Sequence, residues 1–275
     1  MSLSPEQGHT LLDVDLSRRM WELQCWLATQ NDTDAERHVY TGPPHGRALL
    51  TLDAASTSPA ASMNGNRIAI CGTDGGLTER GLRELLAKFT DRGITRVFIW
   101  LSPGADTGVA REWIGALKGR RVPWTRYPTL LFGADTEPPR PAAFEIRQVD
   151  SAGFAAASPA LGDAVLDGYE RTLDRPGFHH FIAWEGGRPV AAAALVQFQD
   201  VGYLTYAGTV ESARGRGAQS ALIAHRVALA RSLGCERIVS QTLTMLEHSF
   251  ANLRRAGFRE VYEQDVYEIT RDVEE

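Results

Sequence analysis

The sequence is short of lysine, of cysteine and of long apolar runs. Lys88 and Lys118 are its only lysines, so nearly all of its 29 basic residues are arginines. The 34 acidic residues outnumber them and leave a formal net charge of −5, which gives no electrostatic reason to expect nucleic acid or an anionic membrane as a partner. No stretch approaches the roughly 18 apolar residues of a membrane helix, and the N-terminus lacks a charged-then-apolar signal pattern. We therefore expect a cytoplasmic protein.

Several classes of site have no support in the sequence. Cys25, Cys71 and Cys235 are far apart and odd in number, which fits neither a disulfide framework nor a metal-ligand cluster and suits a reducing compartment. His179 and His180 are adjacent on an expected strand, so they point to opposite faces and cannot easily share a metal. There is no Gly-x-Ser-x-Gly nucleophile elbow and no His-x-x-x-His pair. Nothing therefore indicates a hydrolase or a metalloenzyme, and we expect no bound metal.

Length and composition indicate two globular domains. At 275 residues, 43% of them apolar and 23% charged, the chain can form two cores of ordinary size. Residues 133–141, Gly-Ala-Asp-Thr-Glu-Pro-Pro-Arg-Pro, are stiffened by proline and are typical of a linker. The predicted domains are residues 1–132 and 142–275, both of the α/β class with mixed sheets.

The first half alternates strand-like apolar runs with helical spacing. We predict a helix over Leu16–Thr29 with Ser17 as its N-cap, a small-residue loop over 54–66, and a tight hairpin turn at Asn64-Gly65. The other expected elements are strands over Arg47–Leu52, Asn66–Cys71, Arg96–Leu101 and Trp124–Phe132, and helices over Thr78–Asp91 and Val109–Lys118.

The second half has a regular order of elements. Helices are expected over residues 151–175, in two pieces broken near Pro159 and Gly162, and over Ala218–Leu233 and Leu246–Arg255. The expected strands cover Phe144–Val149, His179–Trp184, Pro189–Phe198, Gly202–Val210, Ile238–Leu243 and Phe258–Ile269, with the fifth parallel to the fourth.

The most informative stretch is residues 204–233, where a strand leads through a glycine turn into a helix. The start of such a helix presents free N–H groups and a positive dipole end to an anion. Gly215 and Gly217 keep side chains away from the main chain, and Arg214 and Arg216 add positive charge. The stretch predicts a pyrophosphate-binding turn, and an ordinary strand–turn–helix is the alternative.

Three kinds of phosphate-binding loop share this outline. A P-loop ends in Gly-Lys-Ser/Thr, and no lysine lies near this turn. A dinucleotide-binding turn has a third glycine, where this chain has Ser220. Residues 210–219, Val-Glu-Ser-Ala-Arg-Gly-Arg-Gly-Ala-Gln, instead resemble the acetyl-coenzyme A loop of the GNAT acetyltransferases, whose pattern is Arg/Gln-x-x-Gly-x-Gly/Ala. Gln219 stands in place of the last small residue.

Two further stretches extend this resemblance. Residues 249–258, Ser-Phe-Ala-Asn-Leu-Arg-Arg-Ala-Gly-Phe, look like the second GNAT signature, a helix ending in Gly-Phe. The element order over residues 142–270 resembles the GNAT fold. Residues 96–103 and 124–127 look like the degenerate leading domain of tandem GNAT proteins, and an unrelated α/β domain is the alternative. Asp74 in the turn at 72–77 would repel a pyrophosphate, so we expect no coenzyme in the first domain.

The resemblance implies that acetyl-coenzyme A is the acyl donor and that a small-molecule or peptide amine is the acceptor. In the family, the pantetheine chain lies between two splayed parallel strands, here 206–210 and 239–242, and the amine attacks the thioester directly. A backbone N–H near Ala207 or Gly208 would stabilise the oxyanion. The implied coenzyme-binding residues are Thr209, Val210, Arg214, Gly215, Arg216, Gly217, Ala218, Gln219, Ser220, Gln241, Thr242 and Asn252.

The residues that usually transfer protons in the family are missing here. The family tyrosine that lies four residues before the Gly-Phe glycine is Leu253 in this chain, and the strand at 204–209 carries no carboxylate. Ser249, one helical turn before Leu253, and His248 are the nearest polar candidates for handling a proton.

Three hypotheses follow. The leading one is an acetyl-coenzyme A-dependent N-acyltransferase with its site in the second domain, and a homodimer is compatible with it. The second is a coenzyme A-binding sensor or scaffold without catalysis, which the missing tyrosine and carboxylate favour. The third is a structural or interaction protein that binds no coenzyme. Release of free thiol from acetyl-coenzyme A across a panel of amines separates the first two.

Overall fold

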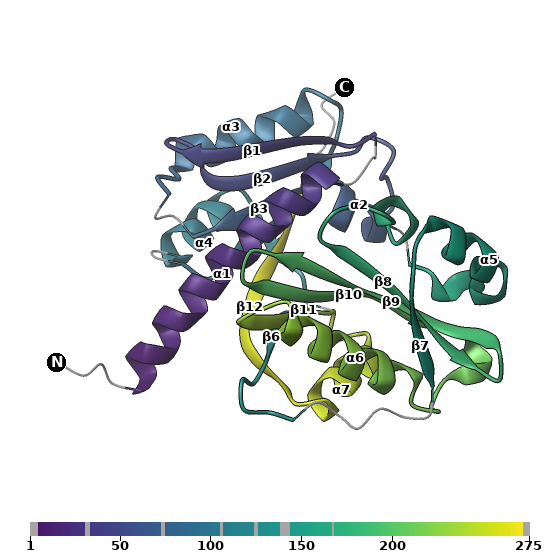
Figure 1. The fold of residues 1–275 in the computed structure, drawn as a ribbon. Coiled ribbons are helices and arrows are strands. Elements are labelled where there is room, and N and C mark those ends of the chain that lie inside the picture. Colours follow the sequence, from purple (N-terminus) through teal and green to yellow (C-terminus); the bar gives the residue numbers. More distant parts are fainter. Residues whose placement is uncertain are drawn as a thin grey trace. The chain divides into compact units, whose positions relative to one another are not determined.

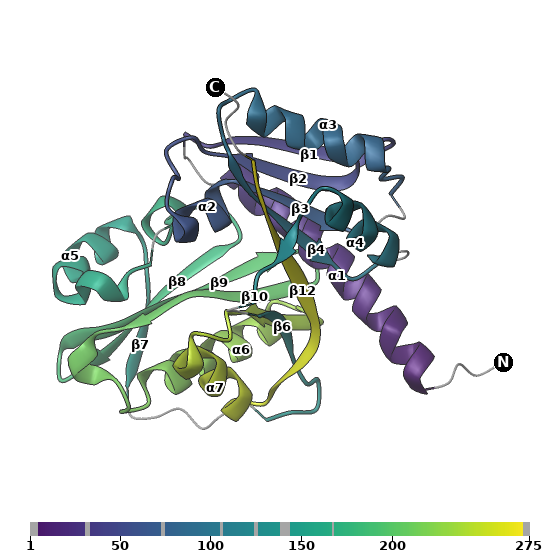
Figure 2. The same ribbon diagram turned by 180° about the vertical axis from the view of Figure 1, so that it is seen from behind.

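The protein is described by a computed structural model that covers residues 5–30, 34–72, 75–104, 107–123, 126–137, 144–166 and 168–271 (Figures 1 and 2). The chain divides into two compact units. The first contains Met1–Tyr127 and Tyr262–Glu275, and the second contains Pro128–Val261. Among the helices of the described ranges, none combines the length and hydrophobicity needed to cross a membrane.

The first unit is built on a mixed sheet. Its strands follow the order β1-β2-β3-β4-β12. Among the described residues of this unit, β3–β4 is the only parallel pair. The short strand β5 pairs with β12. The strand bounds are β1 Glu36–Gly42, β2 Gly46–Leu52, β3 Arg67–Cys71, β4 Arg96–Ser102, β5 Arg120–Arg121 and β12 Phe258–Thr270, of which only the residues from Tyr262 onward belong to this unit.

The helices of this unit, within the described residues, are α1 Pro5–Gln30, α2 Pro59–Gly65, α3 Glu79–Thr90 and α4 Thr107–Ala116. The side chain of Thr78 caps α3 by accepting a hydrogen bond from the Gly81 N–H, and Leu82, Leu85 and Phe89 bury its apolar face. The predicted helices at 78–91 and 109–118 and the strands at 47–52, 66–71 and 96–101 are confirmed within a few residues.

Two local predictions for the first unit are wrong. Ser17 is no N-cap, because α1 begins at Pro5 and Ser17 lies buried inside it, where its hydroxyl donates to the Pro103 carbonyl at 2.8 Å. Asn64-Gly65 forms no hairpin turn, because these residues end α2, which begins with a Ser58 cap and Pro59 in its first turn. Serine, proline and glycine favour both loops and helix ends, so composition could not decide. Asp74 lies outside the described residues.

The second unit contains a largely antiparallel sheet in the order β6-β11-β10-β9-β8-β7, with β10–β11 as the parallel pair. The predicted strands and the parallel pair are confirmed. Their bounds are β6 Tyr127–Phe132, β7 Glu145–Val149, β8 Phe178–Glu185, β9 Arg188–Phe198, β10 Val201–Thr209 and β11 Arg237–Gln241.

Helices cover both faces of this sheet (Figure 1). On one face lie α6 Ala218–Ser232, which contacts β8, β9 and β10, and α7 Glu247–Arg255, which contacts α6. Their residues Leu222 and Leu253 are buried in the same core cluster. On the other face, α5 Ser151–Leu161 buries Phe154. The expected second helical piece before residue 175 is absent from the described residues, which form the 3-10 turns η1 Gly162–Ala164 and η2 Glu170–Thr172 instead.

The unit boundary differs from the predicted one. β6 pairs with β11 and therefore belongs to the second sheet, whereas residues 265–270 of β12 pair with β4 and belong to the first. The two units thus exchange strands: β6 precedes the predicted linker but joins the second sheet, and β12 follows it but residues 265–270 join the first sheet. Hydrogen-bond partners far apart in the sequence decide this exchange, and a proline-rich linker carries no information about them.

Candidate active site

Strands β10 and β11 separate within the second unit. They pair in parallel only from Val201 to Leu204, opposite Arg237 to Ser240, although β10 continues along β9 to Thr209. The Ser240 hydroxyl donates to the Leu204 carbonyl at 3.0 Å, at the last paired position. The edge of β10 beyond Leu204 is therefore left unpaired by β11, as the implied splay requires.

A β-bulge lies on this part of β10, beyond the end of its pairing with β11. Thr205 pairs with Ala194 and Gly208 pairs with Ala192, so Tyr206 and Ala207 together oppose one residue of β9. Tyr206 has φ +51°, a left-handed conformation that is costly for an aromatic residue. Ala207 is exposed. Because a bulge turns backbone groups out of the ladder, it can direct an N–H of this segment away from β9.

Gly208 allows another element to approach the bulge. A Cβ at this position would lie 2.0 Å from the Ala164 carbonyl oxygen of η1. Only glycine therefore permits the observed contact between η1 and β10.

The turn between β10 and α6 has the form of an anion site. After the 3-10 turn η3 Glu211–Ala213, Gly215 has φ +74° and Gly217 has φ +94°. Gly217 is the N-cap of α6 and supplies no capping side chain to the N–H groups of the first helical turn. Arg214 is exposed beside them, and a Cβ on Gly215 would meet nothing within 4 Å. The main chain is therefore open to a phosphate group.

Two side chains of the turn are held by the protein itself. The Arg216 guanidinium lies 2.8 Å from the Glu185 carboxylate and donates to the Ser212 carbonyl at 3.0 Å, so part of its charge is compensated. The Gln219 side-chain amide donates to the Gly208 carbonyl and to the Thr209 hydroxyl, both at 2.9 Å. The residue that departs from the family pattern thus ties the start of α6 to the end of β10. Ala218 is buried and Ser220 is half-buried in the same helical turn.

The remaining predicted residues lie at the end of β11, on α7 and on the segment between these two elements. The Thr242 hydroxyl donates to the Ser249 hydroxyl at 3.3 Å, and the Gln241 amide donates to the Thr129 hydroxyl at 2.8 Å. The Asn252 side-chain amide oxygen Oδ1 accepts a hydrogen bond from the Arg255 guanidinium at 2.5 Å. His248 is exposed at the start of α7.

Leu253 is 5% exposed and packs in the core with Leu130 and Phe258. A tyrosine at this position would have to fit into that core. The leucine of this chain therefore differs from the family tyrosine in its packing as well as in lacking a hydroxyl.

Sequence reasoning missed Arg226, which is 2% exposed in the middle of α6. It donates to the carbonyls of Leu222 and Ala194 at 3.0 Å and of Thr205 at 3.3 Å. The helical spacing contained the signal, since Arg226 lies four residues after buried Leu222 and four before buried Ala230.

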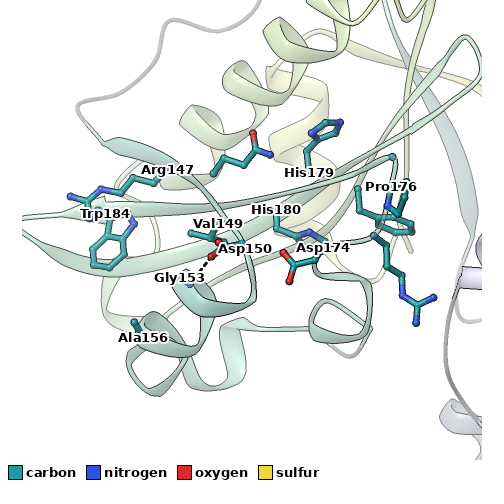
Figure 3. Close-up of a pocket in the computed structure, with 14 residues that line it drawn as sticks. Arg147, Val149, Asp150, Gly153, Ala156, Asp174, Pro176, His179, His180 and Trp184 are labelled. Atoms are coloured by element: carbon teal, nitrogen blue, oxygen red, sulfur yellow. Dashed lines mark hydrogen bonds between the residues drawn. The ribbon is translucent and has the colours of Figure 1, made fainter.

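An open pocket of about 910 Å³ lies elsewhere in the same unit, against β7, β8 and the start of α5 (Figure 3). Its charged groups already have protein partners. Asp150 accepts from the Gly153 N–H at 2.8 Å, Asp174 accepts from Ser151, and Arg147 stacks 4.5 Å from the Trp184 ring. β9 separates these strands from the bulged edge of β10.

The adjacent histidines point to opposite sides of β8, as expected (Figure 3). His180 is buried, contacts the Thr172 hydroxyl at 3.1 Å, and has its pKa lowered to about 4 because burial disfavours the imidazolium. Burial also lowers the pKa of His179. Among the described residues no group of three potential ligands could hold a metal ion.

Comparison with known proteins gives the family of this region. The sequence model of the acetyltransferase (GNAT) family matches residues 144–258, which include the bulge, the glycine turn, α6 and α7. A search of curated proteins finds no relative of this chain.

Solved structures share the fold over most of the chain. A GCN5-related N-acetyltransferase from Kribbella flavida is similar with a TM-score of 0.63 and 16% identity over 93% of this chain and 96% of its own. A tandem GNAT protein from the clavulanic acid biosynthesis pathway has a TM-score of 0.54 and 15% identity over 82% and 80%. A functionally unknown conserved protein from Staphylococcus epidermidis has a TM-score of 0.52 and 12% identity over 87% and 95%. The predicted α/β class and GNAT fold are confirmed.

Proposed function

Because residues 144–258 match the model of the GNAT acetyltransferase family, we propose that this chain transfers an acetyl group from acetyl-coenzyme A to the amine of a small molecule or peptide. The observation that carries this proposal is that one strand combines a bulge beyond the end of its pairing with β11 and a glycine turn that opens a helix. Either feature alone occurs in many folds.

The residues present fit the coenzyme at its pyrophosphate end. Gly215 and Gly217 leave the main chain open, the N-terminus of α6 supplies N–H groups and a positive dipole end, and Arg214 adds an exposed cation. Arg216 is shared with Glu185, so we expect it to contribute less than Arg214. Gln219 already binds the Gly208 carbonyl, so we assign the pantetheine contacts to other main-chain groups of β10 and to residues 241–242.

The chemistry is one acyl transfer. The acceptor nitrogen forms a bond to the thioester carbon of acetyl-coenzyme A, the carbon–sulfur bond breaks with its electron pair on sulfur, and the nitrogen loses a proton. The protein's part is to hold the carbonyl against a backbone N–H of the bulge, for which we assign Ala207. Ser249, supported by Thr242, and exposed His248 are the polar side chains of α7 available to move the proton.

The decisive test replaces Gly217 with glutamine, which puts a side chain into the anion site at a left-handed position. Calorimetry should show loss of acetyl-coenzyme A binding, with only weakened binding for Arg214→Ala. Gly234→Gln is the matched control. Gly234 has φ +77° at the far end of α6, so a glutamine there introduces a similar backbone strain away from the anion site. Unchanged affinity in Gly217→Gln would overturn the proposal.

The same titration reports on the first domain. We propose that the coenzyme binds only in the second unit, so the whole chain should bind one equivalent. Two sites of similar affinity would contradict this.

The alternative function is a coenzyme A-binding sensor or scaffold without catalysis. The observation in its favour is that Leu253 is buried where the family carries a tyrosine, and that no carboxylate lies on β10. Binding of acetyl-coenzyme A without release of free thiol across a panel of amines would favour this alternative.

A further inference from the structure

Arg226 is a buried cation without a catalytic contact of its own. Its hydrogen bonds go to three main-chain carbonyls rather than to a carboxylate. Burial lowers its pKa to about 9, which leaves the guanidinium charged near neutral pH. Burying an arginine charge is costly, so a helix position that needed only packing would be better served by an apolar side chain.

Helix α6 runs back along β10, and three contacts mark the alignment. At one end a Cβ on Gly202 would lie 2.8 Å from the Ala230 Cβ, so the two elements are in close contact there. Arg226 reaches Thr205 in the middle, and Gln219 reaches Gly208 and Thr209 at the other end. The two polar side chains therefore hold β10 on either side of the bulge at Tyr206 and Ala207.

The contact with Thr205 bears directly on the bulge. A peptide unit is planar and trans, so fixing the Thr205 carbonyl also fixes the direction of the Tyr206 N–H. Tyr206 then turns the chain through its left-handed conformation, and the next peptide unit carries the Ala207 N–H. The same guanidinium nitrogen donates to Ala194, the pairing partner of Thr205 on β9. Arg226 thus ties both strands together at the residue where the bulge begins.

We propose that Arg226 is a positioning residue for acyl transfer: it anchors the Thr205 carbonyl at the base of the bulge and thereby aims the Ala207 N–H at the thioester carbonyl. This inference rests on the proposed acetyltransferase function. Its buried positive charge also favours negative charge developing on that carbonyl oxygen. Arg226 touches neither substrate in this account, and acts through the backbone of β10.

The test compares two variants. Arg226→Met keeps an unbranched side chain of similar length but removes the charge, and Arg226→Lys keeps the charge but loses the planar guanidinium that donates to several carbonyls at once. Removing an oxyanion donor lowers kcat by about 10²–10³-fold. A donor that is present but points in the wrong direction should lower kcat by on the order of 10–100-fold. We expect this loss for Arg226→Met, a smaller loss for Arg226→Lys, and a Kd for acetyl-coenzyme A within roughly threefold of native in both. The control is Arg231→Met on the same helix, since Arg231 donates to the Ala134 and Thr136 carbonyls and should leave kcat unchanged.

A spectroscopic readout separates positioning from general damage. The carbonyl stretching band of bound ¹³C-labelled acetyl-coenzyme A should lie below that of the free coenzyme in the native protein and in Arg231→Met. In Arg226→Met it should return toward the free value while thermal unfolding shows a folded protein.

Three results would overturn the inference while leaving the proposed function intact: a native protein that turns over without any band shift, a folded Arg226→Met with native band and kcat, or failure of both Arg226 variants to fold, which would make the residue structural. A native chain that binds no acetyl-coenzyme A would refute the proposed function instead.

Discussion

Among the described residues near the splayed strands, few side chains are placed to transfer a proton in the proposed reaction. Ser249 is held by the Thr242 hydroxyl at 3.3 Å, whereas Leu253, one turn later on α7, points into the core. A thiol has a pKa of about 8.5, so coenzyme A is a tolerable leaving group near neutral pH without a strong acid. The site depends more on backbone groups than on titratable side chains.

Ser249→Ala should therefore slow turnover only modestly, by about tenfold or less, whereas a general acid commonly contributes about 10²–10⁴-fold. The measurement is kcat with saturating amine and acetyl-coenzyme A. Thr242→Val, which removes the partner hydroxyl, is the matched variant and should have a similar or smaller effect. A loss near a thousandfold in Ser249→Ala with coenzyme affinity intact would mean that the serine is a required acid.

His180 makes a prediction about pH at the same scale. Its pKa falls from 6.5 to about 4 on folding. Between these two pH values His180 is protonated in the unfolded chain but neutral in the folded chain. Its contribution to the free energy of unfolding is complete above pH 6.5 and is lost as the pH falls toward 4, by at most about 3–4 kcal/mol at 1.36 kcal/mol per pKa unit. The pKa values of His179 and His225 are lowered as well and add to the slope.

Urea unfolding at several pH values between 7 and 4 measures this effect. His180→Gln should flatten the decline in the free energy of unfolding, and His248→Gln, which changes an exposed side chain, should not. An unchanged slope in His180→Gln would show that the histidine titrates alike in both states.

At the level of elements, β10 is held by three neighbours in different ways. β9 pairs with it along its length except at the bulge, α6 binds it through Arg226 and Gln219, and η1 packs on Gly208. The bulge is thus supported on both faces of the sheet. Tyr206 can retain its unfavourable backbone conformation because these neighbours hold the residues before and after it.

Gly208→Ala should break one of these supports. The added Cβ would lie 2.0 Å from the Ala164 oxygen, so η1 or β10 must shift. We expect a loss of about 1–3 kcal/mol in stability and a fall in kcat larger than the change in coenzyme affinity. Gly108→Ala on α4, where a Cβ meets nothing within 4 Å, is the control in the first unit. Native stability and native kcat in Gly208→Ala would contradict the role given to this contact.

At the level of the whole molecule, the chain is divided differently from its sequence order. Leu130 and Phe132 of β6 are buried in the core of the second unit, and Arg231 donates to the linker carbonyls of Ala134 and Thr136. In the first unit, Asp265 of β12 pairs with Arg111 and Arg121. A boundary placed at the proline-rich segment would remove β6 from its sheet and leave the end of β12 without a partner.

Two fragments test this division. Residues 142–275 lack β6 and its buried side chains, so we expect this fragment to aggregate or to unfold without cooperativity. Residues 126–261 keep the six strands of the second sheet and should unfold cooperatively. Circular dichroism melting curves of both fragments and of the whole chain measure whether each fragment unfolds cooperatively. A fragment 142–275 as stable as residues 126–261 would show that β6 is dispensable.

The sequence by itself determined the local features of this protein: the strand at 201–209, the glycine turn at 214–217, the helix after it and the Gly-Phe end of α7. These depend on periodicity and on backbone preferences of neighbouring residues, which a sequence shows directly. It also contained the family resemblance, because both motifs lie in short continuous stretches.

Only the tertiary structure decided which strand pairs with which and what supports the bulge. The left-handed Tyr206, the buried Arg226 beneath Thr205 and the exchange of β6 and β12 all arise from hydrogen bonds between residues far apart in the chain. Arginine, tyrosine and glycine are ordinary residues in a sequence. Their roles here come from neighbours supplied by the fold, since an arginine becomes a buried anchor only when a helix is laid along the strand whose carbonyls it binds.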